Sequence, residues 1–207
     1  EINENNIVLA NDPATHNFAP FLDTNPAAAP EARFKALGRS PKGLHAYQSE
    51  DGIHWNRMQD QAVITEGRFD SLNLAFFDNL KNQYVEYHRD FRNGVRDIKT
   101  TRSQDFLQWE KPEWLQYPSA LPEHLYTNGI IPYFRAPHVY LGLAKRFVLG
   151  RNPTLHPSGG VSDAVFMSSR DGTTFDRWPE AVIRPGLQTS RWVNRSNMPA
   201  WGIVPTR

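Results

Sequence analysis

Three acidic residues stand where a side chain could do chemistry. Asp12, Asp70 and Glu123 each lie ahead of an apolar stretch that predicts a β-strand. Two neighbouring carboxyl groups can act as an acid–base pair, because one donates a proton while the other, ionised, serves as base or nucleophile. The chain has no Cys, so a thiol nucleophile, a disulfide and a cysteine metal site are excluded.

Two of these residues have simpler explanations. Asp12 precedes a proline and could merely start a turn, and Asp23, in Leu-Asp-Thr-Asn-Pro, is a rival carboxylate in the same part of the chain. Asp70 stands before a strand predicted to be buried, but it could instead cap the turn at Gly67.

The third residue also has competitors. Glu123 follows a proline and is equally well explained as a solvated loop carboxylate. Asp90 could replace any of the three. Alternatively, Arg89 and Asp90 form a surface ion-pair network with the charged residues that follow them, which are Arg92, Arg96 and Asp97.

The elements that must position these residues are marked by two repeats. The first is Ser-x-Asp followed by a closing aromatic residue, at 49–55, 103–109 and 169–175. It predicts a hairpin whose Asp folds back onto its own backbone, with Gly at positive φ in two copies and the aromatic ring under the turn.

The second repeat places an Asn immediately before a short apolar strand, at Asn17, Asn73, Asn128 and Asn197. A return strand follows in the first three units, at 33–37, 84–87 and 139–143, and then a third strand, the Ser-x-Asp turn and a fourth strand. Four antiparallel strands per repeat are typical of a β-propeller blade. We predict an all-β fold of about three and a half blades in one partial propeller domain, residues 1–207; the alternative is an all-β sandwich with chance similarity between turns.

Composition narrows both the fold class and the functional classes that fit the chain. The chain has 207 residues, a net charge of +1, 12% aromatic residues and 16 prolines, which favours a turn-rich β protein. Near-neutral charge argues against a non-specific nucleic-acid binder and against a membrane-surface protein. No apolar run approaches the roughly 18 residues of a membrane span.

The repeated turns and several short motifs resemble those of the five-bladed β-propeller glycoside hydrolases, the superfamily of invertases and arabinanases. The Ser-x-Asp turns resemble those that close the blades there, and Asn-Asp-Pro at 11–13 resembles the segment that carries the invertase nucleophile. The segments 16–26 and 123–128 are similar to those of a bacterial branch of this superfamily. The resemblance covers nearly the whole chain, which is about a blade and a half short of five.

The resemblance implies cleavage of glycosidic bonds in poly- or oligosaccharides, with Asp12 as nucleophile or base, Asp70 as transition-state stabiliser and Glu123 as acid. The alternative is a non-catalytic carbohydrate-binding or assembly module formed by an incomplete propeller. A secreted or periplasmic location is favoured over a cytoplasmic one.

Other polar residues near the strand ends are predicted to bind substrate: His16, Asn17, Asn73, Arg89, Asp90, Asn128, Arg146 and Arg195. The return strands end in basic residues, Arg39, Arg89, Lys145 and Arg146, and a ring of such residues would suit an anionic sugar. Scattered arginines at loop ends and Asn side chains that merely satisfy the backbone are the simpler explanations.

No cofactor or metal site is predicted. Four histidines, His16, His88, His124 and His138, lack any metal-binding spacing, although a propeller channel can hold a hydrated cation. The expected partner is a carbohydrate substrate. An open blade edge is an aggregation hazard, so we expect something to cover it, with a second copy of the chain as one candidate.

Overall fold

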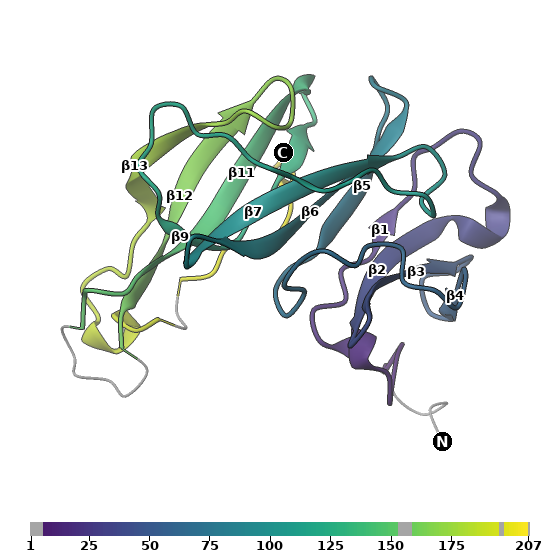
Figure 1. Cartoon of the computed structure of the whole chain (residues 1–207), viewed down its shortest axis with the longest axis horizontal. Coiled ribbons are helices and arrows are strands. Elements are labelled where there is room, and N and C mark those ends of the chain that lie inside the picture. Colours follow the sequence, from purple (N-terminus) through teal and green to yellow (C-terminus); the bar gives the residue numbers. More distant parts are fainter. Residues whose placement is uncertain (1–5, 153–158, 195–196, 207) are drawn as a thin grey trace. The chain divides into compact units, whose positions relative to one another are not determined.

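The computed structural model describes residues 6–152, 159–194 and 197–206. They form strands joined by turns, with three single-turn 3-10 helices, η1 (Pro13–Thr15), η2 (Pro30–Ala32) and η3 (Thr189–Arg191). The predicted all-β class is confirmed (Figure 1). No helix in the described part of the chain is long and apolar enough to cross a membrane.

The first sheet has the strand order β1 (Phe21–Leu22), β2 (Phe34–Ser40), β3 (Gly43–Ser49) and β4 (Asn56–Arg57). All of its pairs are antiparallel. Its buried cluster comprises Ala14, Ala36 and Tyr47, and Phe18 packs edge-on against the Tyr47 ring at 5.5 Å between centroids. This packing fixes the loop that contains η1 against β2 and β3.

The second sheet has the order β5 (Leu74–Asp78), β6 (Gln83–Arg92), β7 (Val95–Ser103) and β8 (Glu113–Trp114). Strand β5 is buried throughout, as its uninterrupted apolar run predicts. The predicted hairpin of 74–77 and 84–87 is confirmed by β5 and β6, and polar turn residues connect them.

The third sheet has the order β10 (Ile131–Tyr133), β11 (Ala136–Val148), β12 (Val161–Ser169) and β13 (Asp176–Ile183), and β9 (His124–Thr127) also pairs with β11. The β11–β12 register runs without a break from Tyr140 opposite Ser169 to Val148 opposite Val161. Four or five antiparallel strands per sheet match the predicted blades.

The chain divides into two compact units, Glu1–Glu86 with Thr101–Pro112, and Tyr87–Thr100 with Glu113–Arg207. Strands β6 and β7 contribute residues to both units. Asp12 and Asp70 therefore belong to the first unit, whereas Glu123 belongs to the second.

The predicted Ser-x-Asp turns are confirmed in all three copies. In the first, the Asp51 carboxylate accepts from the main-chain amides of Ile53 and His54, each at 2.8 Å. The turns at 103–109 and 169–175 repeat both contacts. The carboxylate thus satisfies amides that the turn would otherwise leave unpaired.

Each turn needs one residue in the left-handed region. The φ angle is 77° at Gly52, 83° at Gly172 and 69° at Phe106. The second copy therefore places a phenylalanine where the other two use glycine, at a conformational cost that glycine avoids. The Phe106 ring is fully buried, and its packing offsets that cost.

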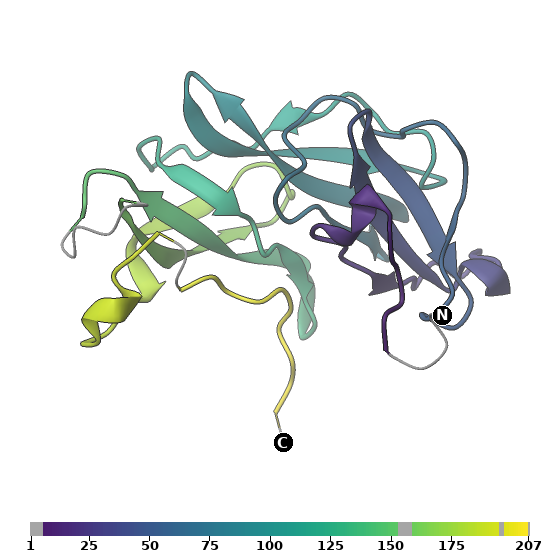
Figure 2. The ribbon, with the colours of Figure 1, turned by 90° about the horizontal axis from the view of Figure 1, so that it is seen from below.

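The segment assigned to the start of a fourth blade forms no strand in residues 197–206. Figure 2 shows it as an extended yellow stretch that continues from the region of η3. It is held to the third sheet by the Trp201 indole, which donates to the Ile130 carbonyl at 3.0 Å. Asn197 donates to the carbonyl oxygen of Ser162 at 2.9 Å.

Candidate functional site

Asp70 lies at the surface, shortly before β5. Its main-chain carbonyl accepts from Asn17 Nδ2 at 3.1 Å and lies 3.3 Å from His16 Nε2. Both side chains come from the loop between η1 and β1. The structure therefore brings three of the predicted site residues, all of them exposed, into one cluster of the first unit.

Two of the residues that follow Asp70 are buried and hold its segment in place. Asn73 is fully buried, and its amide donates to the Phe69 carbonyl at 3.1 Å. Its Oδ1 and the hydroxyl of Ser71 are buried with no hydrogen-bond partner among the described residues. Asn73, predicted to bind substrate, is therefore buried, and it stabilises the segment that carries Asp70.

Asp12 caps η1, where its carboxylate accepts from the Ala14 amide at 2.8 Å. The same carboxylate accepts from the Tyr47 hydroxyl and from Arg57 Nη2, each at 3.1 Å. Burial alone would raise the pKa of Asp12, but these three donors outweigh burial and lower it. The group is held ionised, as a base or nucleophile must be, but both of its oxygens are already engaged.

Glu123 is held between two arginines in the second unit. Its Oε1 accepts from Arg146 at 2.9 Å, and its Oε2 accepts from Arg177 at 2.6 Å. A general acid must carry a proton on one of these oxygens, and both already accept from guanidinium groups. The geometry is that of an ion-pair anchor for the loop ahead of β9.

Arg146, predicted to bind substrate, is committed to this network. Its guanidinium makes a two-pronged pair with Asp163, at 2.9 and 2.8 Å, in addition to the bond with Glu123. Lys145, the preceding residue, is buried, with its ammonium 5.0 Å from the Tyr126 ring centroid. Successive strand residues point to opposite faces of a sheet, so Lys145 contacts Tyr126 on one face and Arg146 contacts Asp163 on the other.

Arg89 shares its aromatic partner with Lys145. Its guanidinium carbon lies 4.9 Å from the Tyr126 ring centroid, and only 3% of Arg89 is exposed. Two of the predicted basic residues therefore meet on one ring in the second unit. Such cation–π contacts strengthen when the cation is removed from water.

Asp90 pairs with Lys99 at 3.1 Å, and Asp97 pairs with Arg92 at 2.6 Å. Of the ion-pair network expected around Asp90, the structure shows the Arg92–Asp97 pair, but Asp90 pairs with Lys99, which was not among the expected residues. Arg89, Asp97 and Lys99 are buried rather than at the surface. Burial raises the pKa of Asp97 against the opposing effect of its partners. Arg195 lies outside the described residues.

Asn128 performs a structural task. Its side chain donates to the Tyr87 carbonyl at 3.3 Å and accepts from the Ile130 amide at 3.1 Å, and the residue is fully buried. The simpler explanation for the repeated Asn residues therefore accounts for Asn128 and Asn73. Among the side chains that the structure describes, no group of three His, Asp or Glu residues could hold a metal ion.

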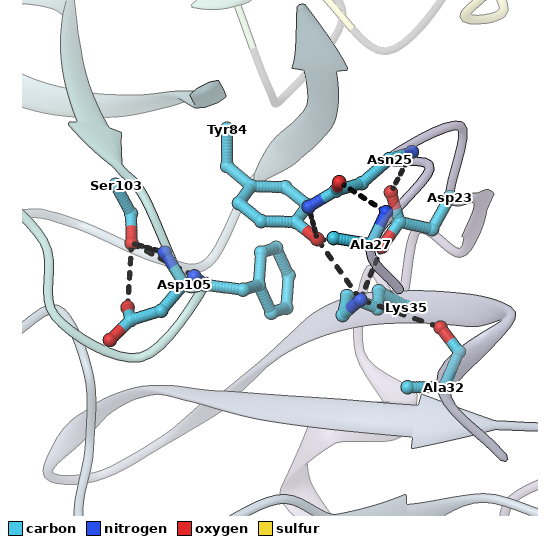
Figure 3. A network of polar contacts seen from close by, with 9 residues as sticks. Asp23, Asn25, Ala27, Ala32, Lys35, Tyr84, Ser103 and Asp105 are labelled. Carbon is cyan, nitrogen blue, oxygen red and sulfur yellow. Dashed lines mark hydrogen bonds and ion pairs between the residues drawn. The ribbon is translucent and has the colours of Figure 1, made fainter. Parts of the chain in front are cut away.

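A buried network in the first unit surrounds Asp23, the rival carboxylate (Figure 3). The Tyr84 hydroxyl donates to Asp23 at 2.7 Å, the Lys35 ammonium pairs with Asp23 and donates to the Tyr84 hydroxyl at 3.1 Å, and Asn25 donates to the same hydroxyl at 3.1 Å. Burial, and next the bond to Asp23, raise the pKa of Tyr84. Lys35 and Asp23 are almost fully enclosed, so this network fastens β1, β2 and β6 together and offers no surface to a ligand.

Sequence reasoning missed Lys35 and Tyr84 as partners of Asp23. A lysine in the middle of an otherwise apolar return strand was the available signal, because a buried lysine requires a carboxylate nearby. The Arg177 contact with Glu123 was also missed. Arg177 follows the third Ser-x-Asp turn, far along the chain from Glu123.

No family profile and no curated protein sequence matches this chain. Solved structures do. An N-acetylgalactosamine deacetylase from F. plautii, in complex with blood group B trisaccharide, is 12% identical with a TM-score of 0.55, over 83% of this chain and 55% of that one. An endo-1,4-beta-xylanase from Bacteroides thetaiotaomicron is 9% identical with a TM-score of 0.54, over 79% and 53%. An endo-arabinase from the same organism is 12% identical with a TM-score of 0.49, over 72% and 57%.

The chain thus spans about half the length of the solved structures that it resembles. At 9% and 12% identity, the first two likenesses show the fold. They agree with three successive antiparallel sheets whose strands follow chain order, which is the arrangement of propeller blades. The predicted β-propeller class is therefore confirmed at the level of the fold.

Proposed function

We propose that the chain belongs to a carbohydrate-active propeller that cleaves glycosidic bonds, with Asp70 as its indispensable carboxylate. The observation that carries the proposal is the exposed cluster of Asp70, His16 and Asn17 beside the start of β5. Propeller enzymes can supply carboxylates at the ends of their innermost strands, and β5 is the first strand and one edge of the second sheet, the position that an innermost strand takes in a blade.

The other two carboxylates fit their proposed roles less well than Asp70 does. Asp12 has the lowered pKa of an ionised nucleophile or base, but it accepts from Tyr47 and Arg57. Glu123 would have to release an arginine before it could serve as an acid. Asp70 is exposed, whereas Asp12 and Glu123 are half-buried, so Asp70 is the most accessible of the three carboxylates.

The test is turnover by the full chain on a panel of neutral and acidic oligosaccharides, scored by new reducing ends. Asp70→Asn should abolish turnover and leave the unfolding temperature unchanged, because the side chain is exposed. Asp60→Asn, which changes another exposed aspartate to the amide, is the matched control. Unchanged turnover in Asp70→Asn removes this residue from the mechanism.

The panel should include N-acetylated sugars, with free acetate measured in parallel. One of the solved structures similar to the chain is described as a deacetylase, so the fold alone does not select the bond that is cleaved. Acetate release without new reducing ends would replace glycosidic cleavage with deacetylation as the reaction.

A second candidate is a carbohydrate-binding module without catalysis. The ion pairs of Asp12 with Arg57 and of Glu123 with Arg146 favour it, because they engage carboxylates that catalysis would need. The triple variant Asp12→Asn, Asp70→Asn, Glu123→Gln separates the two functions. Glycan binding retained by this variant, with no turnover by the native chain, supports the binding module.

A further inference from the structure

A cavity of about 810 Å³ lies against β12 and β13 in the second unit, whereas the Asp70 cluster belongs to the first. Its lining is mainly apolar, from proline and aliphatic side chains, with one tryptophan and a few charged groups. The lining residues that matter here are Arg146, Arg151, Asp163, Glu180, Arg184 and Trp192. An apolar pocket with few polar groups is the usual form of a small-molecule site.

Trp192 supplies a fixed aromatic surface. Its indole N–H donates to the Gly186 carbonyl at 2.8 Å, and its own main-chain amide donates to the Thr189 carbonyl at 3.0 Å. The residue remains 37% exposed while it lines the cavity. Because its polar edge is already bonded, the ring can present its face to the apolar C–H surface of a sugar.

The floor of the cavity carries charges that are already neutralised. Arg146 and Asp163 form their two-pronged pair at 2.9 and 2.8 Å, and the Pro179 carbonyl accepts from Arg146 at 2.8 Å. This pair shapes the cavity and has little charge left to attract a ligand.

Two arginines at the rim keep their charge. Within the described residues neither Arg151 nor Arg184 forms an ion pair, and both side chains are exposed. Arg184 is oriented through Nε, which donates to the Ala181 carbonyl at 3.0 Å, and its terminal nitrogens remain for a ligand. A guanidinium presents donors in the planar arrangement that a carboxylate accepts.

Glu180 limits what the cavity can hold. It is exposed and lines the same space without an ion-pair partner among the described residues. With the Arg146–Asp163 pair set aside, the lining carries two positive charges against one negative. A ligand with a single carboxylate on an otherwise uncharged body suits this balance better than a densely charged anion does.

We propose that this cavity binds a uronic acid residue of a glycan, with the sugar ring on Trp192 and its carboxylate at Arg151 and Arg184. The proposal rests on the proposed action on carbohydrates and names the substrate class. The cavity is a binding subsite in the second unit, and Arg146 in its lining also pairs with Glu123, whereas Asp12 and Asp70 belong to the first unit.

The test measures binding of trigalacturonate and of the matched neutral galactose trimer to the full chain that carries Asp70→Asn, by calorimetry at low salt. The acidic trimer should bind about 10-fold or more tightly than the neutral one, since a charge-assisted pair contributes on this scale. The difference should shrink as ionic strength rises, because the rim arginines are exposed.

Three variants assign the effect to the cavity. Arg184→Gln and Trp192→Ala should each weaken binding of the acidic trimer about 10-fold, whereas Glu180→Gln should tighten it, because a like charge is removed. Arg135→Gln, which changes an exposed arginine in the turn between β10 and β11, should change nothing. If Trp192→Ala lowers the unfolding temperature, its weaker binding could reflect unfolding. The proposal is then judged on the substitutions of Arg184 and Glu180, which are exposed.

Opposite effects of Arg184→Gln and Glu180→Gln cannot come from a merely structural role. Equal binding of the acidic and neutral trimers, no binding of the acidic trimer, or unchanged affinity in these two variants overturns the proposal. Turnover of neutral glycans by the native chain is scored separately, so the proposed function can stand when this subsite fails.

Discussion

Asn17 donates from its side-chain amide to the main-chain carbonyl of Asp70 at 3.1 Å, although 53 positions separate them along the chain. Asn17 adopts a left-handed backbone with φ of 63°, a conformation that asparagine tolerates better than most residues do. The first of the repeated Asn residues thus positions the carboxylate proposed for catalysis, and it acts through the backbone.

We predict that Asn17→Asp lowers turnover about 10-fold without unfolding the protein. Aspartate has the same shape and tolerates the same φ, but it replaces the donor with an oxygen that repels the Asp70 carbonyl. Loss of this hydrogen bond, at about 1 kcal/mol in activation free energy, corresponds to roughly a five-fold slower reaction, and the repulsion raises the barrier further. The measurement is kcat/KM together with the unfolding temperature.

Asn82→Asp is the matched control for this substitution. Asn82 also has a left-handed backbone, with φ of 52°, and lies exposed in the turn between β5 and β6. It should leave kcat/KM unchanged. Equal losses in the two variants would mean that added negative charge, rather than the contact with Asp70, slows the reaction.

The network around Asp23 yields a prediction about stability. Lys35→Met should reduce the free energy of unfolding by about 3 to 5 kcal/mol, because it leaves the enclosed Asp23 carboxylate without its cation. Tyr84→Phe should cost about 1 to 3 kcal/mol, because it removes one hydrogen bond to that carboxylate while the ring packing remains. Urea unfolding measures both.

A double variant tests whether the charge itself is responsible. In Lys35→Met combined with Asp23→Asn the buried charge is gone, so the loss should be smaller than in Lys35→Met alone. An additive loss would show that Lys35 contributes mainly through the cation–π contact of its ammonium with the Tyr84 ring, whose centroid lies 5.2 Å from that nitrogen.

The features that the sequence predicts well are local. The Ser-x-Asp turns depend on side chains that bond amides two or three residues away, and all three form. The β5–β6 hairpin depends on an apolar run, a polar turn and a second apolar run that are contiguous in the chain. Such patterns need no knowledge of tertiary neighbours, so they can be read directly.

The site depends on distant partners, and there prediction was incomplete. Lys35 and Tyr84 lie 12 and 61 positions from Asp23, and no spacing rule connects them. The sequence predicts Lys145 and Arg146 alike as basic residues at the end of one strand. Their alternation puts one on Tyr126 and the other on Asp163, and only the register of β11 reveals this.

Phe106 offers a test of strain against packing. Phe106→Gly should relieve about 1 kcal/mol of left-handed strain but forfeit about 3 to 5 kcal/mol of buried ring contacts, for a net loss of roughly 2 to 4 kcal/mol. The ring centroid lies 5.1 Å from that of Tyr84 and 5.5 Å from that of Trp109. Urea unfolding gives the net value.

Gly52→Ala measures the strain by itself in the equivalent position. Its φ is 77°, and an added Cβ would meet the Phe34 ring at 3.6 Å, an ordinary contact. The expected cost is therefore conformational, about 1 kcal/mol. A gain in stability for Phe106→Gly would show that the strain exceeds the packing, contrary to this balance.

The three Ser-x-Asp turns also predict how stability depends on pH. Although burial opposes it, the Thr174 and Thr173 amides lower the pKa of Asp171 to about 2, and the pKa values of Asp51 and Asp105 are lowered by amides in the same way. In the unfolded chain such groups titrate near 3.9. Between about pH 4 and 2 the unfolded state therefore binds more protons, so stability is complete above pH 4 and falls as the pH drops.

Urea unfolding at pH 7, 4, 3 and 2.5 should show this decline for the native chain. Asp171→Asn should be less stable than the native chain at pH 7, because a neutral amide is a weaker acceptor for the turn amides, but its decline below pH 4 should be shallower. Asp60→Asn should follow the native curve, since Asp60 is exposed and outside the turns. An equally steep decline in Asp171→Asn would show that this turn does not carry the acid sensitivity, and Asp51 and Asp105 in the other two turns would be the next groups to substitute.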